Sequence, residues 1–486
     1  MILGYNEVIS MSLHKKTAIG VTWNLLEQFG KRGVSGIVTI ILARFLSPEE
    51  FGLIAMLTVF IQIANSLMES GFLQALIQKT EADQRDFCTV FYTNITFGLT
   101  AYAILYFSAP LISTFYEESR LVLIIRIVGI SIVVNSFRII QEAKLSKELK
   151  FKELMIASVP GALLSGVVAI GLAVIGAGVW ALVAQIILST LFTTLFLWFS
   201  TAWKPRILFS VSSFKSLFGY GSKLFLSGLI NIVFQNIFVV VIAKVFSAQE
   251  AGYYFFAYKM QQFIVYQLNG AVLRVTFPAL SSIQNQQNKL KKGFRQLLQV
   301  LTFIIFPIVI FIAALAEPIF KIFLSNSWLP AVPYMQLLLI AGMIVPLHTV
   351  NLNILKVKGR SDLFLYLEFV KKLFVIIVLI ISLRFGISAI LIGQIITSFI
   401  GYIPNSYFSN KLIGYNMKEQ VNDLSFSFIL TSLIGAVTFS LSNMLDWTAT
   451  NELFVLSLLS VSVYFFVSYI GKVPALGTIY KIVKRN

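Results

Sequence analysis

Charged side chains stand at helical spacing inside the first long apolar stretch of the chain. Glu27, Lys31 and Arg32 lie well within residues 18–46, which are otherwise apolar enough to span a bilayer. Each charge at the centre of a lipid-facing helix costs about 2.5–3.5 kcal/mol. Because three occur together, we expect them to face protein or water. Cations so placed bind anions, and an acid there binds a cation or a proton.

The spacing gathers these polar groups onto one face of a helix. Gly20, Asn24, Glu27, Lys31 and Ser35 follow one another at intervals of three or four residues, so they form a single stripe. Glu27 precedes Lys31 by four residues, the better order for an ion pair. Two interpretations stay open: a structural ion pair, and the polar wall of a cavity.

The next apolar segment, residues 50–78, has a polar face of its own. It carries Gln62, Asn65 and Glu69. The segment is introduced by Ser47, a good helix N-cap that is followed by proline at the first helical position. Two neighbouring spans therefore each turn a polar face away from lipid.

This hairpin occurs twice. The motif Ala-[Arg/Lys]-x-x-Ser-x-x-Glu-x-Gly occupies residues 43–52 and returns at residues 243–252, and on the same offset Gln62 corresponds to Gln262. The helix entering the second hairpin has its own stripe: Lys223, Ser227, Asn231 and Gln235. A repeat of this length in a membrane chain is typical of a transporter with two related lobes and a site at their interface.

Composition places the chain in a membrane. Of its 486 residues 57% are hydrophobic and 12% are charged, which is too apolar for a soluble core. The net charge of +17 comes from basic residues in loops between apolar spans, so it is a topology signal and does not indicate nucleic acid. The lone cysteine, Cys88, excludes an intrachain disulfide and a cysteine metal site, and two histidines exclude a His-rich one.

The apolar segments define the expected architecture. We predict an all-α integral membrane protein with about 14 transmembrane helices: two six-helix lobes related by a pseudo-twofold axis along the membrane normal, plus a C-terminal helix pair. The lobes occupy residues 1–202 and 217–412, an interfacial linker helix occupies 203–216, and the extra pair with a basic tail occupies 413–486. The segments are 18–46, 50–78, 88–110, 119–140, 154–175, 178–201, 217–246, 249–281, 298–323, 331–355, 363–383, 387–410, 425–442 and 453–470.

The basic loops also fix the expected orientation. With the amino terminus in the cytoplasm, about 24 basic residues fall on the inner side and about 5 on the outer side. Both termini are then cytoplasmic, which requires an even number of spans. Residues 47–52 and 247–252 belong to the outer side.

The spans contain more cations than acids. The acids are Glu27, Glu69 and Glu368, and the nine cations are Lys31, Arg32, Arg126, Arg138, Lys223, Lys259, Arg274, Lys371 and Lys372. A cationic cavity fits an anionic substrate, such as a lipid pyrophosphate or an acidic sugar.

Each of these cations has a less functional interpretation. Arg138 and Arg274 are close enough to the inner boundary to snorkel, and at least one of Lys371 and Lys372 is expected to snorkel or to pair with Glu368 three residues away. The amides of the polar stripes could simply hold helices together by hydrogen bonds. Lys223, Lys259 and Arg126 have no obvious local partner, which favours a cavity.

Four stretches resemble bacterial polysaccharide and O-antigen flippases. They are residues 43–56, 140–151, 178–185 and 277–283. The resemblance is to the Wzx-type branch that includes the colanic acid and teichuronic acid exporters, within the multidrug/oligosaccharidyl-lipid/polysaccharide superfamily. It implies two six-helix lobes around a central cavity. It also implies movement of an undecaprenyl-pyrophosphate-linked glycan from the inner to the outer leaflet of the bacterial cytoplasmic membrane.

On this basis we expect a flippase that works by alternating access and is not an enzyme. Lys31, Arg32, Lys223, Lys259 and Arg126 would surround the anionic groups of the substrate. The sugar hydroxyls would bind the amides of Gln62, Asn231, Gln235 and Gln262. Glu27 or Glu69 would bind a coupling Na⁺ or H⁺, with no other cofactor. Expected partners are the lipid-linked oligosaccharide, membrane lipids, and polysaccharide polymerase and export machinery.

Two alternatives stay open. A cation-coupled antiporter of small molecules in the same superfamily needs the same cavity and a coupling acid. A membrane polymerase or ligase of glycans is less favoured, because that chemistry needs acid and base groups in outer loops, which are short here.

Overall fold

The computed structural model of the chain is helical, and the described residues contain no strand. The structure describes residues 2–79 and 81–484. Within these ranges only the backbone is described at residues 2–19, 21, 70–71, 220, 266–279, 361 and 481–483.

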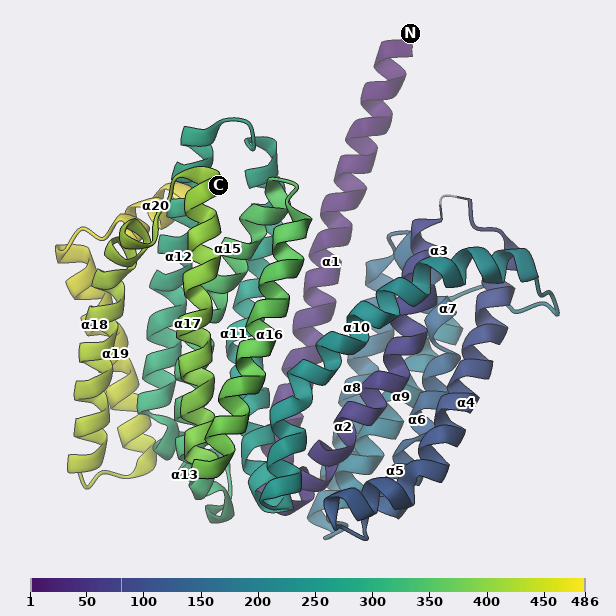
Figure 1. The fold of residues 1–486 in the computed structure, drawn as a ribbon, viewed down its shortest axis with the longest axis horizontal. Helices are drawn as coiled ribbons and strands as arrows, with labels where there is room; N and C mark the ends of the chain where they lie inside the picture. Colours follow the sequence, from purple (N-terminus) through teal and green to yellow (C-terminus); the bar gives the residue numbers. More distant parts are fainter. Residues whose placement is uncertain (1, 80, 485–486) are drawn as a thin grey trace. The chain divides into compact units, whose positions relative to one another are not determined.

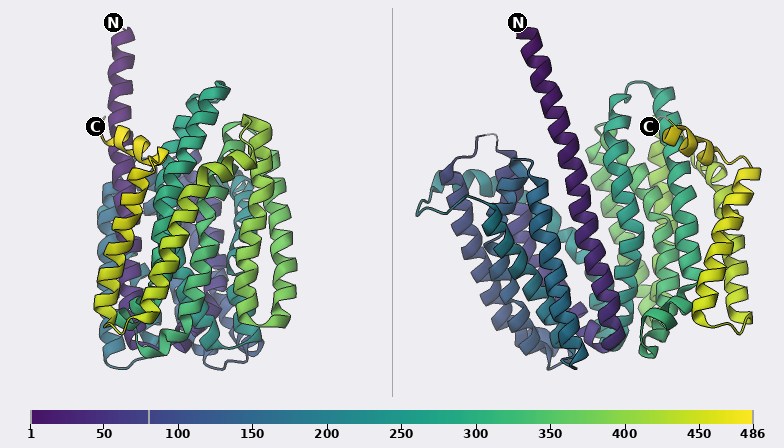
Figure 2. Two further views of the ribbon diagram at one scale, coloured as in Figure 1. Left: turned by 90° about the vertical axis from the view of Figure 1, so that its left-hand side faces the viewer. Right: turned by 180° about the vertical axis from the view of Figure 1, so that it is seen from behind.

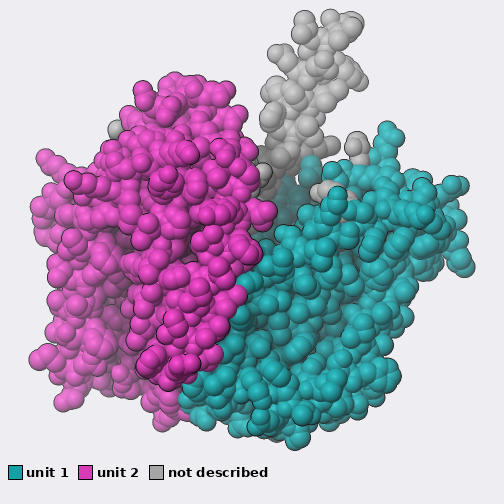
Figure 3. Space-filling view, viewed as in Figure 1, with its two compact units in different colours: residues 1–255 teal, residues 256–486 magenta. Residues whose placement is uncertain are grey.

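The chain divides into two compact units, residues 1–255 and 256–486, coloured separately in Figure 3. The lobes predicted from the repeat, residues 1–202 and 217–412, stay a prediction. The helix α10 (Val211–Val245) packs on α2 (Pro48–Met68) and belongs to unit 1 by its contacts.

Unit 1 is a bundle of long helices that run in alternating directions (Figure 1). The helix α11 begins in unit 1 and continues into unit 2. The elements are α1 (Ile2–Phe45), α2, a π-helical turn (Glu69–Leu73), α3 (Gln74–Gln78), α4 (Gln84–Tyr116), α5 (Leu121–Val128), α6 (Ile130–Ser136), α7 (Ile139–Lys147), α8 (Phe151–Val174), α9 (Val179–Ser200), α10 and α11 (Ala248–Ser282).

Unit 2 is a second bundle, and its last two long helices lie side by side as a pair (Figure 2). The elements are α12 (Gln287–Ala314), α13 (Ala316–Phe323), a short 3-10 turn (Asn326–Ala331), α14 (Val332–Met343), α15 (Val345–Val357), α16 (Ser361–Ser382), a 3-10 turn (Leu383–Phe385), α17 (Ile387–Ile413), α18 (Met417–Met444), α19 (Ala449–Ile470) and α20 (Pro474–Lys484).

The helices account for every apolar segment of the sequence. In the part of the chain that the structure describes, 11 helices are long and apolar enough to cross a membrane. The remaining predicted segments are α1, α11 and α16, which are long enough but carry charges along their length. The chain is a multi-pass helical membrane protein, consistent with about 14 spans.

The predicted linker helix at 203–216 is wrong over its first half. Residues 201–210 are not helical, and Pro205 within them disfavours helical geometry at the residue before it. The segment is tied to α4: Trp203 Nε1 donates to Gln84 Oε1 at 2.8 Å, and the Ser210 amide donates to Thr89 Oγ1 at 3.0 Å.

Several spans are interrupted. The segment predicted at 119–140 consists of α5, α6 and the start of α7, with breaks at Gly129 and Phe137–Arg138. The segment predicted at 331–355 breaks at Ile344, two residues before Pro346. These are the fourth spans of the two sequence halves. The residues at these positions keep right-handed helical backbone angles, so the breaks are local irregularities within spans that continue through them.

The repeat is also visible in how the helices begin. Ser47 caps α2 as predicted: its side chain accepts a hydrogen bond from the Glu50 amide, and the Ser47 amide donates to Glu50 Oε2 at 2.7 Å. Ser247 accepts from the Glu250 amide in the same way, at 3.1 Å. Gly178 and Gly386, which begin α9 and α17, both have positive φ, at 60° and 89°.

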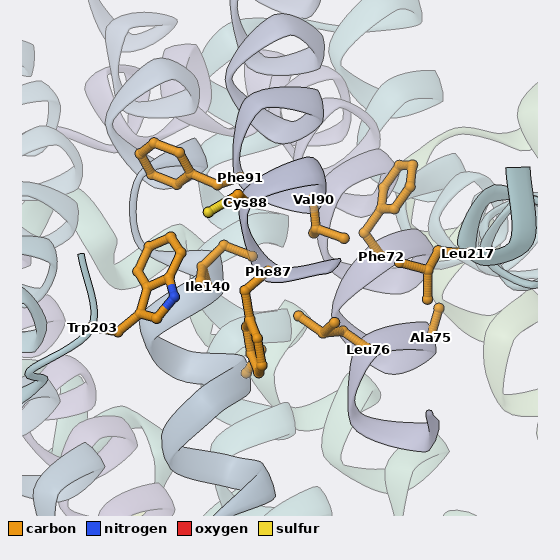
Figure 4. Packing of buried hydrophobic residues seen from close by; sticks show 11 residues of the cluster. Phe72, Ala75, Leu76, Phe87, Cys88, Val90, Phe91, Ile140, Trp203 and Leu217 are labelled. Atoms are coloured by element: carbon orange, nitrogen blue, oxygen red, sulfur yellow. The ribbon is translucent and has the colours of Figure 1, made fainter. Parts of the chain in front are cut away.

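A buried aromatic cluster in unit 1 holds the non-helical segment after α9 against α4. Trp203 is 4% exposed, and its ring centroid lies 5.6 Å from that of Phe91 and 6.4 Å from that of Phe87. Figure 4 shows Trp203 on one side of α4 and Leu217 of α10 on the other. The cluster therefore joins the start of α10 to the first half of the sequence.

Ion pairs link the loops at one end of unit 1. Arg120 pairs with Glu118 at 2.7 Å and also with Glu49, and Lys244 of α10 pairs with Glu117 at 2.7 Å. Hydrogen bonding from Lys244 lowers the pKa of Glu117, and hydrogen bonding from Arg120 lowers the pKa of Glu118.

Replacing Trp203 with alanine should lower the free energy of unfolding by about 3–5 kcal/mol, because it removes a buried indole and its hydrogen bond. Thermal unfolding of the purified protein in detergent measures this. Trp447, which is 45% exposed, is the matched control, and its replacement by alanine should change little. Equal shifts for the two variants would contradict the packing role of Trp203.

The pairing of Glu118 should give a pH-dependent stability. Since the folded-state pKa is lowered, the stabilisation is complete above the ordinary value of 4.5 and is lost as the pH falls through the folded pKa. The melting temperature of Glu118→Gln should lie below that of the parent protein at pH 6 and approach it at pH 3. The exposed Glu81→Gln serves as control, and a gap that stays constant with pH would rule the effect out.

Candidate polar site in unit 1

Two interrupted helices bring charges together in the interior of unit 1. We call Asn65, Glu69, Asn135, Arg138 and Glu142 the Glu69 cluster. Asn135 Nδ2 donates to Asn65 Oδ1 at 2.9 Å and to Glu69 Oε1 at 3.2 Å. Arg138 lies 3.3 Å from Glu69 Oε1 through Nη2 and 3.3 Å from Glu142 Oε2 through Nε. One guanidinium thus joins two carboxylates from different helices.

The local backbone explains this placement. Glu69 is the first residue of the π-helical turn that ends α2, and Arg138 stands at the break between α6 and α7. Such irregular turns shift the direction of side chains relative to a continuous helix and are frequent at functional sites. Asn135 is 3% exposed and the Arg138 side chain 15%, whereas the Glu69 side chain is 43% exposed. The acid is therefore the accessible member.

This geometry corrects one expectation. Arg138 was expected to snorkel to the membrane boundary, but it forms two ion pairs inside the bundle instead. The reason is that Glu69 and Glu142 offer it a pair of carboxylates within reach, which sequence spacing alone could show only for Glu142, at i+4.

The helix α1 adds a further cation to the cluster. The Lys31 ammonium lies within electrostatic range of Arg138, Glu142, Glu27 and Glu69. It is half-buried, and Arg32 beside it is exposed. Lys31 is thus close enough to these charged groups to interact with them electrostatically.

Glu27 is bonded to Ser158 and not to Lys31, the partner that the sequence spacing suggested. Its Oε1 accepts a hydrogen bond from Ser158 of α8 at 3.0 Å, and among the described side chains no ion pair joins it to Lys31. Part of the α1 stripe therefore packs on α8. Gly30 lies on the same face, where an added Cβ would be 3.1 Å from Val159.

The side chains of the α10 stripe are exposed. Lys223, Ser227, Asn231 and Gln235 are all exposed, on a helix whose residues 221–245 are apolar enough to span a membrane. An exposed polar side chain at every turn of a spanning helix is expected where the helix lines water and not lipid.

Gln62 joins α2 to α10. Its Oε1 accepts from Asn236 Nδ2 at 2.9 Å, and Asn236 is 7% exposed. Sequence reasoning singled out Asn231 and Gln235 and missed Asn236, which is one position off the stripe. Its partner lies 174 positions away, so only the fold reveals the pair.

Arg126 lies apart from the other candidates. Its guanidinium carbon is 4.3 Å from the centroid of the Tyr106 ring on α4, and its Nε is 3.5 Å from the Tyr106 carbonyl oxygen. The structure thus gives Arg126 an aromatic partner twenty positions away, which the local sequence does not reveal.

Two candidates belong to unit 2. Lys259 is exposed and Gln262 half-buried, both on α11. Arg274, also on α11, lies outside the described side chains. In the described residues no group of three or more His, Cys, Asp or Glu side chains could hold a metal ion.

Unit 2 has a polar cluster that sequence reasoning overlooked. His348 of α15 is 2.9 Å from the Ser398 carbonyl oxygen through Nε2 and 2.8 Å from Asn405 Nδ2 through Nδ1, both on α17. The carbonyl can only accept, so the Nε2–H donates to it and Nδ1 accepts from the amide. Lys371 pairs with Glu368, which confirms the pairing at i, i+3.

Replacing Arg138 with glutamine should destabilise the protein by about 2 kcal/mol, because two carboxylates lose a charged donor. The single variant Glu69→Gln and the double variant complete a cycle. The double variant should lose less than the sum of the two single losses, by at least 0.5 kcal/mol, since the residues share one interaction. Additive losses in thermal unfolding would show that the pair contributes nothing.

Comparison with known proteins places this geometry in a family. A model described as polysaccharide biosynthesis protein matches residues 41–333. The teichuronic acid biosynthesis protein TuaB of Bacillus subtilis is 27% identical over 390 residues, 79% of this chain and 80% of that protein. The lipopolysaccharide biosynthesis protein WzxC of Escherichia coli is 25% identical over 439 residues, 89% of this chain and 88% of that protein.

Solved structures show the same fold. The lipid II flippase MurJ in an inward closed conformation aligns with a TM-score of 0.71 at 17% identity, covering 92% of this chain and 97% of that one. An inward-facing MATE family multidrug resistance transporter of the MOP superfamily aligns with a TM-score of 0.63 at 15% identity, covering 78% and 95%. At these identities the likeness concerns the fold alone. Since the family model spans more than half of the sequence, the chain belongs to the family of polysaccharide biosynthesis proteins.

Proposed function

We propose that the protein is a flippase that moves undecaprenyl-pyrophosphate-linked oligosaccharide repeat units from the inner to the outer leaflet. The observation that carries the proposal is the placement of cations in spanning helices: Lys223 is exposed on α10, and Lys31 stands beside the Glu69 cluster. The relatives named for teichuronic acid and lipopolysaccharide biosynthesis support a glycan substrate. The fold shared with a lipid II flippase supports a lipid-linked one.

The residues divide by chemistry. Lys31, Arg32, Lys223 and Lys259 each offer a positive charge to the pyrophosphate or acidic sugars of the substrate. Asn231, Gln235 and Gln262 offer amides to sugar hydroxyls. Arg126, which contacts the Tyr106 ring, stays a further candidate for the anionic groups.

Glu69 is the better candidate of the two coupling acids. Its side chain is 43% exposed and forms an ion pair with Arg138, whereas Glu27 accepts a hydrogen bond from Ser158. Binding of H⁺ or Na⁺ at Glu69 would weaken its pair with Arg138 and so change how α2 and α7 are tied together. A coupling ion would act on the fold by this route.

We place the protein in the cytoplasmic membrane of a bacterium with both termini in the cytoplasm. The support is the excess of basic residues in one set of loops. The proposal is a transporter and not a catalyst, working beside the polymerase and export machinery that use the flipped glycan.

Lys31→Gln and Lys223→Gln should each reduce translocation of the lipid-linked glycan about tenfold at normal membrane levels, because each loses about 1.4 kcal/mol of anion attraction. Fluorescent lipid-linked oligosaccharide in reconstituted vesicles gives the rate. Lys418→Gln, at an exposed position of α18, is the matched control. Unchanged rates in both interior variants would count against this site.

Deletion of the gene tests the substrate itself. Lipid-linked intermediates should accumulate in the inner leaflet, where mass spectrometry identifies the glycan. Transport of small organic cations in the same vesicles, with no movement of the lipid-linked glycan, would favour an antiporter instead.

A further inference from the structure

The two copies of the repeated hairpin touch through their glycines. A Cβ added at Gly52 would lie 1.7 Å from the carbonyl oxygen of Ala248, and one added at Gly252 would lie 1.8 Å from the carbonyl oxygen of Pro48. All four residues, which we call the glycine seam, belong to unit 1. The two contacts are the same contact exchanged between the repeats, since each pair differs from the other by 200 positions.

The seam leaves no room for a side chain at either glycine. The atoms opposite each glycine are backbone, so no rotamer change can relieve the contact. Gly52 and Gly252 are both buried, and the neighbouring Phe51 and Ala251 are 2% and 0% exposed. In this conformation both positions therefore require glycine, which explains why the residue closes both copies of the repeated motif.

The seam is nevertheless a weak attachment. It apposes a glycine Cα to a carbonyl oxygen, a contact worth at most a fraction of an ordinary hydrogen bond. Water at the membrane surface can replace it when the hairpins part. A contact that packs closely but needs little free energy to break suits two hairpins that separate and close repeatedly.

We propose that the glycine seam is the closed state of an outer gate, whose two hairpins separate once in every transport cycle. The inference rests on the proposed function, since alternating access requires an outer closure, and on the loop charges that assign residues 47–52 and 247–252 to the outer side. The reciprocal contact places a pseudo-twofold axis between the two glycines. The hairpins can therefore part symmetrically, each moving as the other does. A methyl group at either glycine holds the gate open.

Spin labels at Phe45 and Val245 report the gate directly. Both side chains are exposed, at 49% and 53%, and they occupy corresponding positions in the two repeats. The labels are introduced in a Cys88→Ser background, and pulsed dipolar spectroscopy measures the distance in vesicles. The resting protein should show a short distance, and a longer one should appear during turnover with undecaprenyl-pyrophosphate-linked disaccharide.

Gly52→Ala and Gly252→Ala should lose the short distance and translocate at least tenfold more slowly. Gly171→Ala is the matched control, because nothing lies within 4 Å of its added Cβ, and it should keep both the distance and the rate. A wild-type distance distribution in either seam variant overturns the proposal.

If the seam variants fail to reach the membrane, the distance between the labels in the protein with both glycines intact still tests the gate. One unchanging short distance throughout turnover then overturns the gate, whereas a second, longer distance supports it. Absence of any translocation by the unmodified protein would instead count against the proposed function. In that case, a short distance in the intact protein that is lost in the seam variants would still support the closure.

Discussion

A charge inside a spanning helix requires an opposite charge, an aromatic face or water, and the interior of unit 1 follows this requirement. Arg138 satisfies it with Glu69 and Glu142, and Arg126 satisfies it with Tyr106. Lys223 has an exposed side chain that water can reach, on a helix whose residues 221–245 are apolar enough to span a membrane. The different solutions separate cations that hold the bundle together from cations available to a substrate.

The ion pairs lie beside local irregularities of the helices. Glu69 is the first residue of the π-helical turn, Arg138 stands between α6 and α7, and their side chains meet at 3.3 Å. The fourth span of the second half is interrupted as well, at Ile344 beside His348. Both halves thus pair a broken helix with a polar cluster, although the residues in the two clusters differ.

The two copies of the repeat share their backbone geometry but differ in the chemistry of the polar stripes that precede them. Residues 43–52 and 243–252 keep the same caps and the same glycine contact, because backbone geometry leaves few alternatives. The stripes that precede them do not match: Lys31 neighbours a cluster of paired charges, and Lys223 lies on an exposed face. This combination suits a transporter of an asymmetric lipid-linked glycan. The two hairpins of the gate must move alike, whereas the residues that bind the glycan need not be the same in the two copies.

The sequence by itself determined the helical membrane fold, the segments that span, the duplicated hairpin and the Ser47 cap. All of these follow from composition or from spacing of a few residues along one helix. Only the tertiary structure decided the partners of Glu27, Arg126 and Arg138, the role of Asn236, the His348 cluster and the placement of α10 in unit 1. Those contacts join helices that are far apart in sequence, and helical periodicity specifies which face a side chain occupies but not which neighbour that face meets.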